Sequence, residues 1–129
     1  MGSRDIASDY QKKKLRVYAM LNIDMTGYNP DKANTIALIT NSASSSLNEF
    51  AGKVITEYCK NKFVKKSMFG GSSDHASWTR AGYHAIFPFE YKSNPYIHSS
   101  KDTVDRLDLK NAIEYVKLSV GFVIELSSF

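Results

Sequence analysis

The fold of this chain is decided by Val17-Tyr18-Ala19-Met20-Leu21-Asn22-Ile23-Asp24, a nearly continuous apolar run that ends in a carboxylate. A run of this kind predicts a strand over residues 16–25 that is buried on both faces, as in the sheet of an α/β protein. Ligands of open α/β sheets gather outside the carboxyl ends of the strands, so Asp24 is a candidate site residue by position alone. The alternative for such a carboxylate is to cap the following turn.

The rest of the chain predicts helices that alternate with strands. Apolar spacing and capping residues predict helices over residues 3–14, 44–62, 74–80 and 107–126, and strands over residues 35–40 and 83–89. Residues 65–73 form a polar, glycine-containing stretch that predicts a loop. This order indicates a three-layer α/β/α arrangement. Three strands make a thin sheet, so we expect the sheet to continue on residues that this chain lacks.

The last predicted helix has its aliphatic residues at helical intervals. They share one side of the helix and are Leu109, Ile113, Val116, Val120 and Val123.

Composition limits the classes of partner. The 129 residues contain 17 Lys and Arg against 13 Asp and Glu, a net charge of +4, and the basic residues lie in short surface-type clusters without interleaved aromatics, so no nucleic-acid surface is expected. No apolar stretch reaches the roughly 20 residues of a membrane span. The single cysteine, Cys59, excludes an internal disulfide and a cysteine-based zinc cluster.

Short chemical motifs make only a weak case for catalysis. The sequence contains no His-Glu-x-x-His, Cys-x-x-Cys or His-x-Asp, and neither a Gly-x-Ser-x-Gly turn nor a phosphate-binding loop. His98 lies in a loop rich in Ser, Lys and Asp, where an exposed or capping histidine is the ordinary expectation. His75, within Ser-Asp-His-Ala-Ser-Trp, is expected to be packed in a helix.

Four segments together carry a far more specific pattern. They are residues 22–26 (Asn-Ile-Asp-Met-Thr), 73–78 (Ser-Asp-His-Ala-Ser-Trp, followed by Ala-Gly-Tyr at 81–83), 88–90 (Pro-Phe-Glu) and 97–103 (Ile-His-Ser-Ser-Lys-Asp-Thr). In order and approximate spacing they resemble the bacterial leucine aminopeptidases that use two zinc ions. The resemblance covers nearly the whole chain, and it implies that residues 1–129 form the carboxyl-terminal portion of such a catalytic domain.

The resemblance implies which residues would hold the metals. In that family two histidines, a bridging aspartate, a glutamate and a second aspartate bind the zinc ions, and a neighbouring glutamate is the general base. Asp24 corresponds to the second aspartate and His98 to one histidine, one on each metal. The other ligands and the base are expected upstream, so this chain has no catalytic residue of its own. Because zinc requires about four ligands, we expect weak or no zinc binding and no activity by the chain alone.

The resemblance also implies an apolar pocket for a leucine-like first residue of a peptide with a free N-terminus. Ser73 is expected to donate a hydrogen bond near the site. Residues 68–72 (Met-Phe-Gly-Gly-Ser) stand where well-known members have a cysteine pair around a tyrosine, so Phe69 would substitute for that aromatic ring. The alternative for the apolar members is core packing. The corresponding positions are Met25, Ile39, Phe69, Ser73, Phe87, Phe89 and Ile97.

Two other functions stay open at this point. One is a glutaminyl-cyclase-like relative, which shares the fold but uses one zinc; the other is a non-catalytic, peptidase-like interaction module. The aromatic strand around Phe87 and Phe89 disfavours the first, and the presence of both Asp24 and His98 disfavours the second. If part of the domain is missing, an exposed sheet edge favours self-association. The resemblance implies secretion of the parent protein.

Overall fold

The computed structural model describes residues 2–128. The elements follow one another as α1 (Gly2–Lys12), β1 (Met20–Leu21), the 3₁₀ helix η1 (Pro30–Lys32), β2 (Thr35–Ile39), α2 (Ser45–Tyr58), β3 (Lys62–Lys66), α3 (Asp74–Arg80), β4 (Ala85–Ile86), β5 (Pro88–Glu90), η2 (Val104–Arg106) and α4 (Leu109–Ser127). No helix in this described part of the chain has the length and apolar character needed to cross a membrane.

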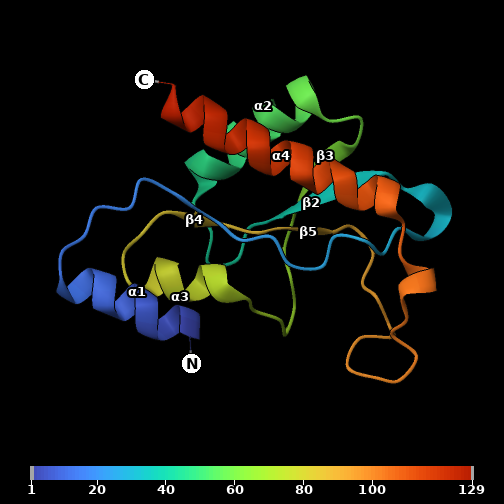
Figure 1. The fold of residues 1–129 in the computed structure, drawn as a ribbon, viewed down its shortest axis with the longest axis horizontal. Coiled ribbons are helices and arrows are strands. Elements are labelled where there is room, and N and C mark those ends of the chain that lie inside the picture. Colours follow the sequence, from blue (N-terminus) through green and yellow to red (C-terminus); the bar gives the residue numbers. More distant parts are fainter. Residues whose placement is uncertain (1, 129) are drawn as a thin grey trace.

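The elements form three layers, with α1 and α3 on one side of the strands and α2 and α4 on the other (Figure 1). β2 pairs in parallel with β3 and antiparallel with β5, with Ala37 opposite Phe89. β1 pairs in parallel with β4, where Met20 lies opposite Ala85. Because β4 and β5 are parts of one segment, β1 lies at the far edge of this small sheet from β3. The predicted α/β/α architecture is therefore confirmed.

Two apolar clusters hold the layers together. The larger one lies between the sheet and the pair α2 and α4, and it includes Ile36, Ile55, Ile86, Leu118 and Phe122. The smaller one contains Ala37, Ile39 and Phe87, with Met68 and Phe89 packed against it. Residues of β2 alternate between the two clusters, as a strand covered on both faces requires.

Several predicted boundaries were wrong. The strand expected over residues 16–25 contains only Met20–Leu21, because its one strand partner among the described residues, β4, pairs with it over two residues. α2 ends at Tyr58 rather than near residue 62, and Lys62–Lys66 forms β3 where a helix end and a loop were expected. The strand expected over residues 83–89 is divided at Phe87 into β4 and β5.

The side of α4 that faces the core is partly polar. Asn111 and Glu114 are buried there beside Tyr115, Leu118 and Phe122. Their polar atoms have partners: the Asn111 side chain donates to the Thr26 carbonyl at 2.8 Å, and Glu114 accepts from Lys117 Nζ at 2.7 Å. These hydrogen bonds offset the cost of burying the two polar side chains. The aliphatic side predicted from the sequence faces outward instead, and all five of its residues are exposed.

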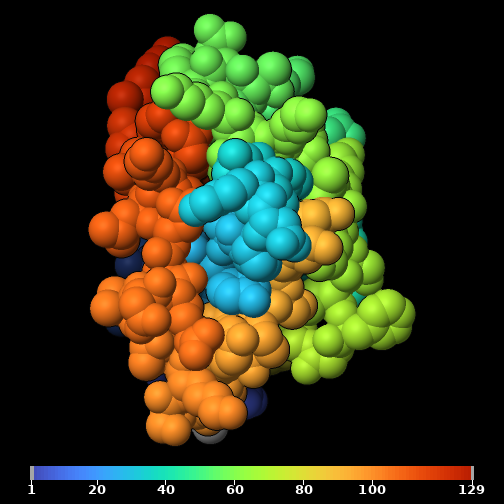
Figure 2. Space-filling model, turned by 90° about the vertical axis from the view of Figure 1, so that its right-hand side faces the viewer, coloured from blue at the N-terminus to red at the C-terminus, as the bar shows by residue number. Residues whose placement is uncertain are grey.

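The start of α4 is fixed by the segment before β2. Asp108 caps the helix, because its side chain accepts from the Lys110 backbone N–H at 3.0 Å. The same carboxylate accepts from Lys32 Nζ at 2.9 Å and from the Asn29 amide at 3.1 Å. Figure 2 shows this segment, in cyan, lying against the start of α4, in orange.

Candidate functional site

Asp24 lies just beyond the carboxyl end of β1, in the loop where the sequence placed it. The side chain is exposed, and its Oδ2 accepts a hydrogen bond of 2.8 Å from the Ser73 hydroxyl. Ser73 has an extended backbone and is the residue that precedes α3. The start of α3 therefore supplies a donor that orients the Asp24 carboxylate, and this pairs two residues that the sequence analysis had singled out separately.

The backbone next to Asp24 is unusual. Met25 has a φ of 60°, and His98, the second candidate ligand, has a φ of 59°. Left-handed backbone is uncommon for residues other than glycine, costs on the order of 1 kcal/mol, and is enriched at functional sites. Both loops that carry the candidate ligands contain this conformation at or beside the ligand, but so do five other non-glycine residues in the described part of the chain, so it does not by itself mark a site.

A buried carboxylate, Glu90, lies at the end of β5 between these loops. It is 2% exposed, and its Oε1 accepts from the Tyr28 backbone N–H at 2.5 Å. Burial raises the pKa of Glu90; the Tyr28 and Gly27 N–H groups oppose this rise, and the charges of Asp102 and Asp24 add to it. Asp24 and Asp102 therefore lie near enough to Glu90 for their charges to act on it.

The loop that carries His98 is anchored to the loop after Asp24. The rings of Tyr28 and Tyr96 meet edge to face with centroids 6.4 Å apart, and the Arg106 guanidinium lies 4.0 Å from the Tyr96 ring centroid. The Ser99 hydroxyl donates to the Tyr96 carbonyl at 2.6 Å. His98 itself is exposed. These contacts bring the two ligand-bearing loops to the same end of the sheet.

The described residues do not complete a metal site. Asp24 and His98 offer the oxygen and nitrogen donors that zinc accepts. No hydrogen bond joins the two within residues 2–128, and no group of three or more His, Cys, Asp or Glu side chains gathers there. Asp24 and His98 are suitable zinc ligands, but two protein ligands are too few for a catalytic zinc site. This chain alone therefore supports no zinc-dependent catalytic step.

The predicted pocket positions fall into two groups. Ile39 and Phe87 are buried and pack with Phe89, whose ring lies 5.1 Å from that of Phe87. The Ser73 hydroxyl donates a hydrogen bond to Asp24, and Met25 directly follows Asp24 in the sequence. Ile97 is exposed beside His98. Phe69 is 98% exposed. The loop 67–73 turns its side chain toward solvent, so Phe69 does not join the apolar cluster.

Comparison with known proteins identifies the family. The model of the family described as Peptidase family M28 matches residues 1–123. The chain belongs to peptidase family M28. A probable leucine aminopeptidase of Arthroderma otae is 38% identical over 130 residues, which are 98% of this chain and 35% of that protein. The chain thus spans about a third of the length of such M28 relatives.

Solved structures agree with the family. The Legionella pneumophila LapA aminopeptidase matches with a TM-score of 0.92 and 35% identity, over 99% of this chain and 36% of that one. BSAP, a zinc aminopeptidase from Bacillus subtilis, matches with a TM-score of 0.80 over 97% of this chain and 32% of that one. At 21% identity the second likeness shows the fold alone.

His75 has a structural role in this M28 chain, as the sequence analysis expected. It is buried, its ring stacks on Phe87 with centroids 4.7 Å apart, and its Nε2 lies 3.1 Å from the Asn41 carbonyl. Burial lowers the pKa of His75, which favours the neutral ring.

Sequence reasoning missed Glu90 as a residue of the site. It appeared only as the last letter of the Pro-Phe-Glu motif. The available signal was a carboxylate directly after the apolar run 85–89, since a charge at the end of a buried strand falls at the ligand-binding edge of the sheet.

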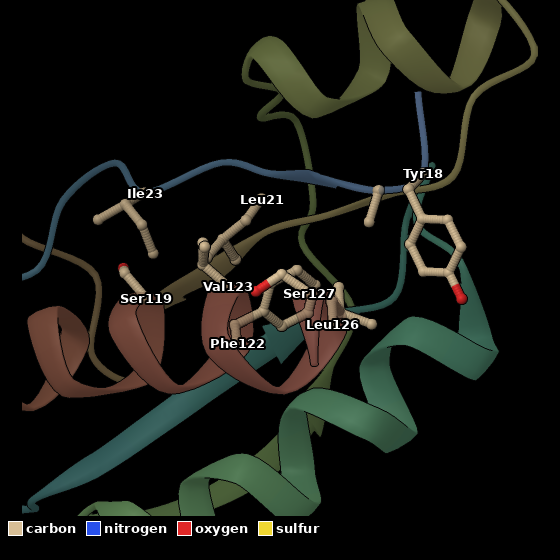
Figure 3. A pocket seen from close by; sticks show the side chains of 9 residues that line it. Tyr18, Leu21, Ile23, Ser119, Phe122, Val123, Leu126 and Ser127 are labelled. Atoms are coloured by element: carbon tan, nitrogen blue, oxygen red, sulfur yellow. The ribbon is translucent and has the colours of Figure 1, made fainter. Parts of the chain in front are cut away.

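A large apolar groove lies beside the segment that leads to Asp24. It has a volume of about 520 Å³ and runs between β1 and α4, where Leu21 and Ile23 face Phe122, Val123 and Leu126 (Figure 3). The groove lacks carboxylate, imidazole and thiol groups, so it offers no ligands for a metal.

Proposed function

We propose that this chain forms the carboxyl-terminal part of a zinc-dependent aminopeptidase that removes leucine-like N-terminal residues from peptides. The observation that carries the proposal is the position of Asp24: it stands at the carboxyl end of β1, oriented by Ser73, in a chain whose residues 1–123 match the M28 family. The aminopeptidase names of its relatives support the activity, and the description of BSAP as a zinc enzyme supports the metal.

The proposal assigns one ligand to each of two zinc ions, Asp24 to one and His98 to the other. Zinc would supply Lewis acidity and a water of lowered pKa. The residues of this chain supply positioning. The Ser73 hydroxyl fixes the Asp24 carboxylate, and Glu90 holds the following loop through the Tyr28 N–H. Phe89 and Met68, on the buried Phe87 and Ile39, offer an apolar surface suited to an aliphatic side chain.

The proposal includes inactivity of the 129-residue chain by itself. The described residues gather fewer than three potential ligands at any point, and zinc catalysis requires three protein ligands and an open position. Secretion stays a prediction from the family resemblance.

The test compares the chain with the longer protein encoded around it, using leucine p-nitroanilide and added zinc. We expect no turnover by the chain and zinc-dependent turnover by the longer protein. Asp24→Ala and His98→Ala in the longer protein should each lower the rate by about 100-fold or more, since even supporting residues of a metal site cost 10–100-fold. The matched controls Asp9→Ala and His84→Ala remove exposed side chains of the same types elsewhere and should retain activity.

Three results would contradict the proposal. Turnover by the pure chain that disappears in Asp24→Ala would disprove its inactivity. Full activity of the longer protein without Asp24 and His98 would disprove their role as ligands. Cyclisation of N-terminal glutamine by the longer protein, without release of leucine, would favour a glutaminyl-cyclase-like function.

A further inference from the structure

Two buried polar atoms that have no hydrogen-bond partner within residues 2–128 are chemically complementary. One is the side-chain amide nitrogen of Asn22, which donates, and the other is Nδ1 of His75. Asn22 is 8% exposed and His75 is 2% exposed, so both are covered by atoms of this chain. Buried polar groups in folded proteins nearly always have a partner. A partner for each of these atoms is therefore expected inside the chain.

The contact of His75 with Asn41 fixes which ring nitrogen carries the proton. Nε2 lies 3.1 Å from the Asn41 carbonyl, and a carbonyl oxygen can only accept a hydrogen bond. Nε2 of the neutral ring is therefore protonated, and Nδ1 carries the lone pair. Burial keeps the ring neutral because it lowers the pKa of His75. Nδ1 thus requires a donor.

The register of the sheet places Asn22 beside Phe87, the residue on which the His75 ring stacks. Leu21 lies opposite Ile86, and the Asn22 backbone N–H continues the pairing by donating to the Ile86 carbonyl at 3.0 Å. Side chains alternate between the two faces of a strand. Leu21 faces the groove beside α4, so Asn22 faces the side of the sheet that α3 covers (Figures 1 and 3).

The orientation of the His75 ring directs Nδ1 toward β1. Phe87 has β2 on one side, where its carbonyl accepts from the Ile39 backbone N–H at 3.0 Å, and β1 on the other. Asn41, the partner of Nε2, lies just beyond the end of β2. The two nitrogens of an imidazole point to nearly opposite sides of the ring. Nδ1 therefore points away from β2 and toward the strand that carries Asn22.

The other buried side-chain atoms without a partner within residues 2–128 lie on the opposite face of the sheet. They are the oxygens Oδ1 of Asn48 and Oε2 of Glu90. Asn48 belongs to α2, and the charge of Glu90 acts on Tyr115 of α4. α2 and α4 cover the side away from α3 (Figure 1). Of these acceptors, His75 Nδ1 is thus the one on the side of Asn22.

We infer that the Asn22 amide donates a hydrogen bond to Nδ1 of His75, directly or through one water molecule, and that this buried link positions Asp24 against Ser73. Asn22 lies two residues before Asp24, and His75 lies two residues after Ser73. The link therefore lies behind the exposed hydrogen bond of 2.8 Å from Ser73 to Asp24 and joins the same two segments. Asn22 and His75 act through these residues and are positioning residues. Their effect on catalysis rests on the proposed function.

Nuclear magnetic resonance of the ¹⁵N-labelled 129-residue chain tests the link without turnover. In wild type we expect an Overhauser effect between the amide protons of the Asn22 side chain and Hε1 of His75, the ring proton next to Nδ1. Asn22→Leu removes the donor at similar volume and should move the Nδ1 resonance to higher chemical shift. Asn22→Asp places a carboxylate beside the ring and should raise the pKa of His75.

The matched controls are Asn61→Leu and Asn61→Asp. Asn61 is also 8% exposed but precedes β3, at the end of the sheet opposite to Asn41. Both controls should leave the Nδ1 resonance and the pKa of His75 unchanged, and circular dichroism checks that each variant is folded. Absence of the Overhauser effect in wild type overturns the link. An unchanged pKa of His75 in folded Asn22→Asp does so as well.

The positioning role has its own readout in the same chain. Overhauser effects between the β-protons of Asp24 and Ser73 should weaken in Asn22→Leu and persist in Asn61→Leu. In the longer protein, Asn22→Leu should lower kcat for leucine p-nitroanilide about 10-fold or more at a nearly unchanged KM. Unchanged Overhauser effects between Asp24 and Ser73 overturn the positioning role. A longer wild-type protein without turnover contradicts the proposed function instead, since the link and the positioning role are both decided in the 129-residue chain.

Discussion

At the scale of single residues, Glu90 and Glu114 are two buried carboxylates whose pKa values move in opposite directions because their partners differ. Burial alone would raise the pKa of Glu114, but its hydrogen bonds to Lys117, Lys60 and Asn61 outweigh burial and lower it. Glu90 accepts from the Tyr28 backbone N–H at Oε1, while Oε2 is buried with no partner among the described residues, and burial raises the pKa. The environment, not the residue type, decides the direction of the pKa shift.

This difference predicts how stability responds to pH. A carboxyl whose pKa is higher in the folded than in the unfolded state binds more protons when folded, so its contribution to stability falls as the pH rises from its ordinary pKa, about 4.3, through the folded value. Glu90→Gln keeps an oxygen acceptor for the Tyr28 N–H and cannot ionise. We expect the variant to lose less stability than wild type between about pH 4 and pH 7.

Urea denaturation at a series of pH values measures this effect as the free energy of unfolding. Glu57→Gln, at an exposed position of α2, is the matched control and should keep the wild-type pH dependence. An unchanged slope in Glu90→Gln would show that Glu90 does not carry a raised pKa.

At the scale of elements, the contact between α2 and α4 depends on Gly121. A Cβ at this position would lie 2.9 Å from both Val54 Cγ1 and Tyr58 Cδ2. Helix propensity alone predicts that Gly121→Ala stabilises α4 by about 1 kcal/mol. Overpacking of a closely packed contact costs about 1–3 kcal/mol. Because Val54 is buried and cannot move aside easily, we expect a net destabilisation of Gly121→Ala.

Urea denaturation at neutral pH checks the sign. Gly2→Ala in the first turn of α1 is the control, because nothing lies within 4 Å of an added Cβ there; it should leave stability unchanged or slightly higher. Equal or greater stability of Gly121→Ala would mean that α4 can shift away from α2 at little cost.

The elements also show where sequence patterns suffice and where they do not. β2 is predictable because Ile36, Ala37, Leu38 and Ile39 form a continuous buried run. β3 is not, since Lys62–Lys66 is mostly polar and is a strand through backbone pairing with β2. α4 shows the limit of periodicity: its regular aliphatic repeat faces outward, while Asn111 and Glu114 are buried by virtue of partners that sequence spacing does not reveal.

In the candidate site, too, some features could be predicted from the sequence and others could not. Asp24 was predictable because it ends an apolar run, and the family resemblance added His98 and Ser73. The hydrogen bond from Ser73 to Asp24 spans 49 positions in sequence, and the contact of Glu90 with Tyr28 spans 62. Such long-range partners depend on how the loops at the end of the sheet come together. Local pattern therefore does not predict them.

At the scale of the whole molecule, the chain presents an ordered three-layer core together with a candidate site at which the described residues gather fewer than three potential metal ligands. Its fold agrees with LapA at a TM-score of 0.92 although it spans 36% of that chain. The core does not depend on the metal, because both apolar clusters and the polar contacts of Asn111 and Glu114 are formed by protein atoms alone. Stability and metal binding should therefore be separable in this chain.

The stability of the 129-residue chain should accordingly be insensitive to zinc. A ligand present at 100 times its dissociation constant stabilises the folded state by about 2.7 kcal/mol, so a site with a dissociation constant near 1 µM would do so at about 100 µM zinc. Asp24 and His98 alone should give much less, below about 0.5 kcal/mol, because the described residues gather no third ligand. Urea unfolding in zinc and in EDTA measures the difference, with His84→Ala as the control for binding to an exposed histidine. A stabilisation of about 2 kcal/mol or more that disappears in both Asp24→Ala and His98→Ala, but not in the control, would show that these 129 residues build a complete zinc site.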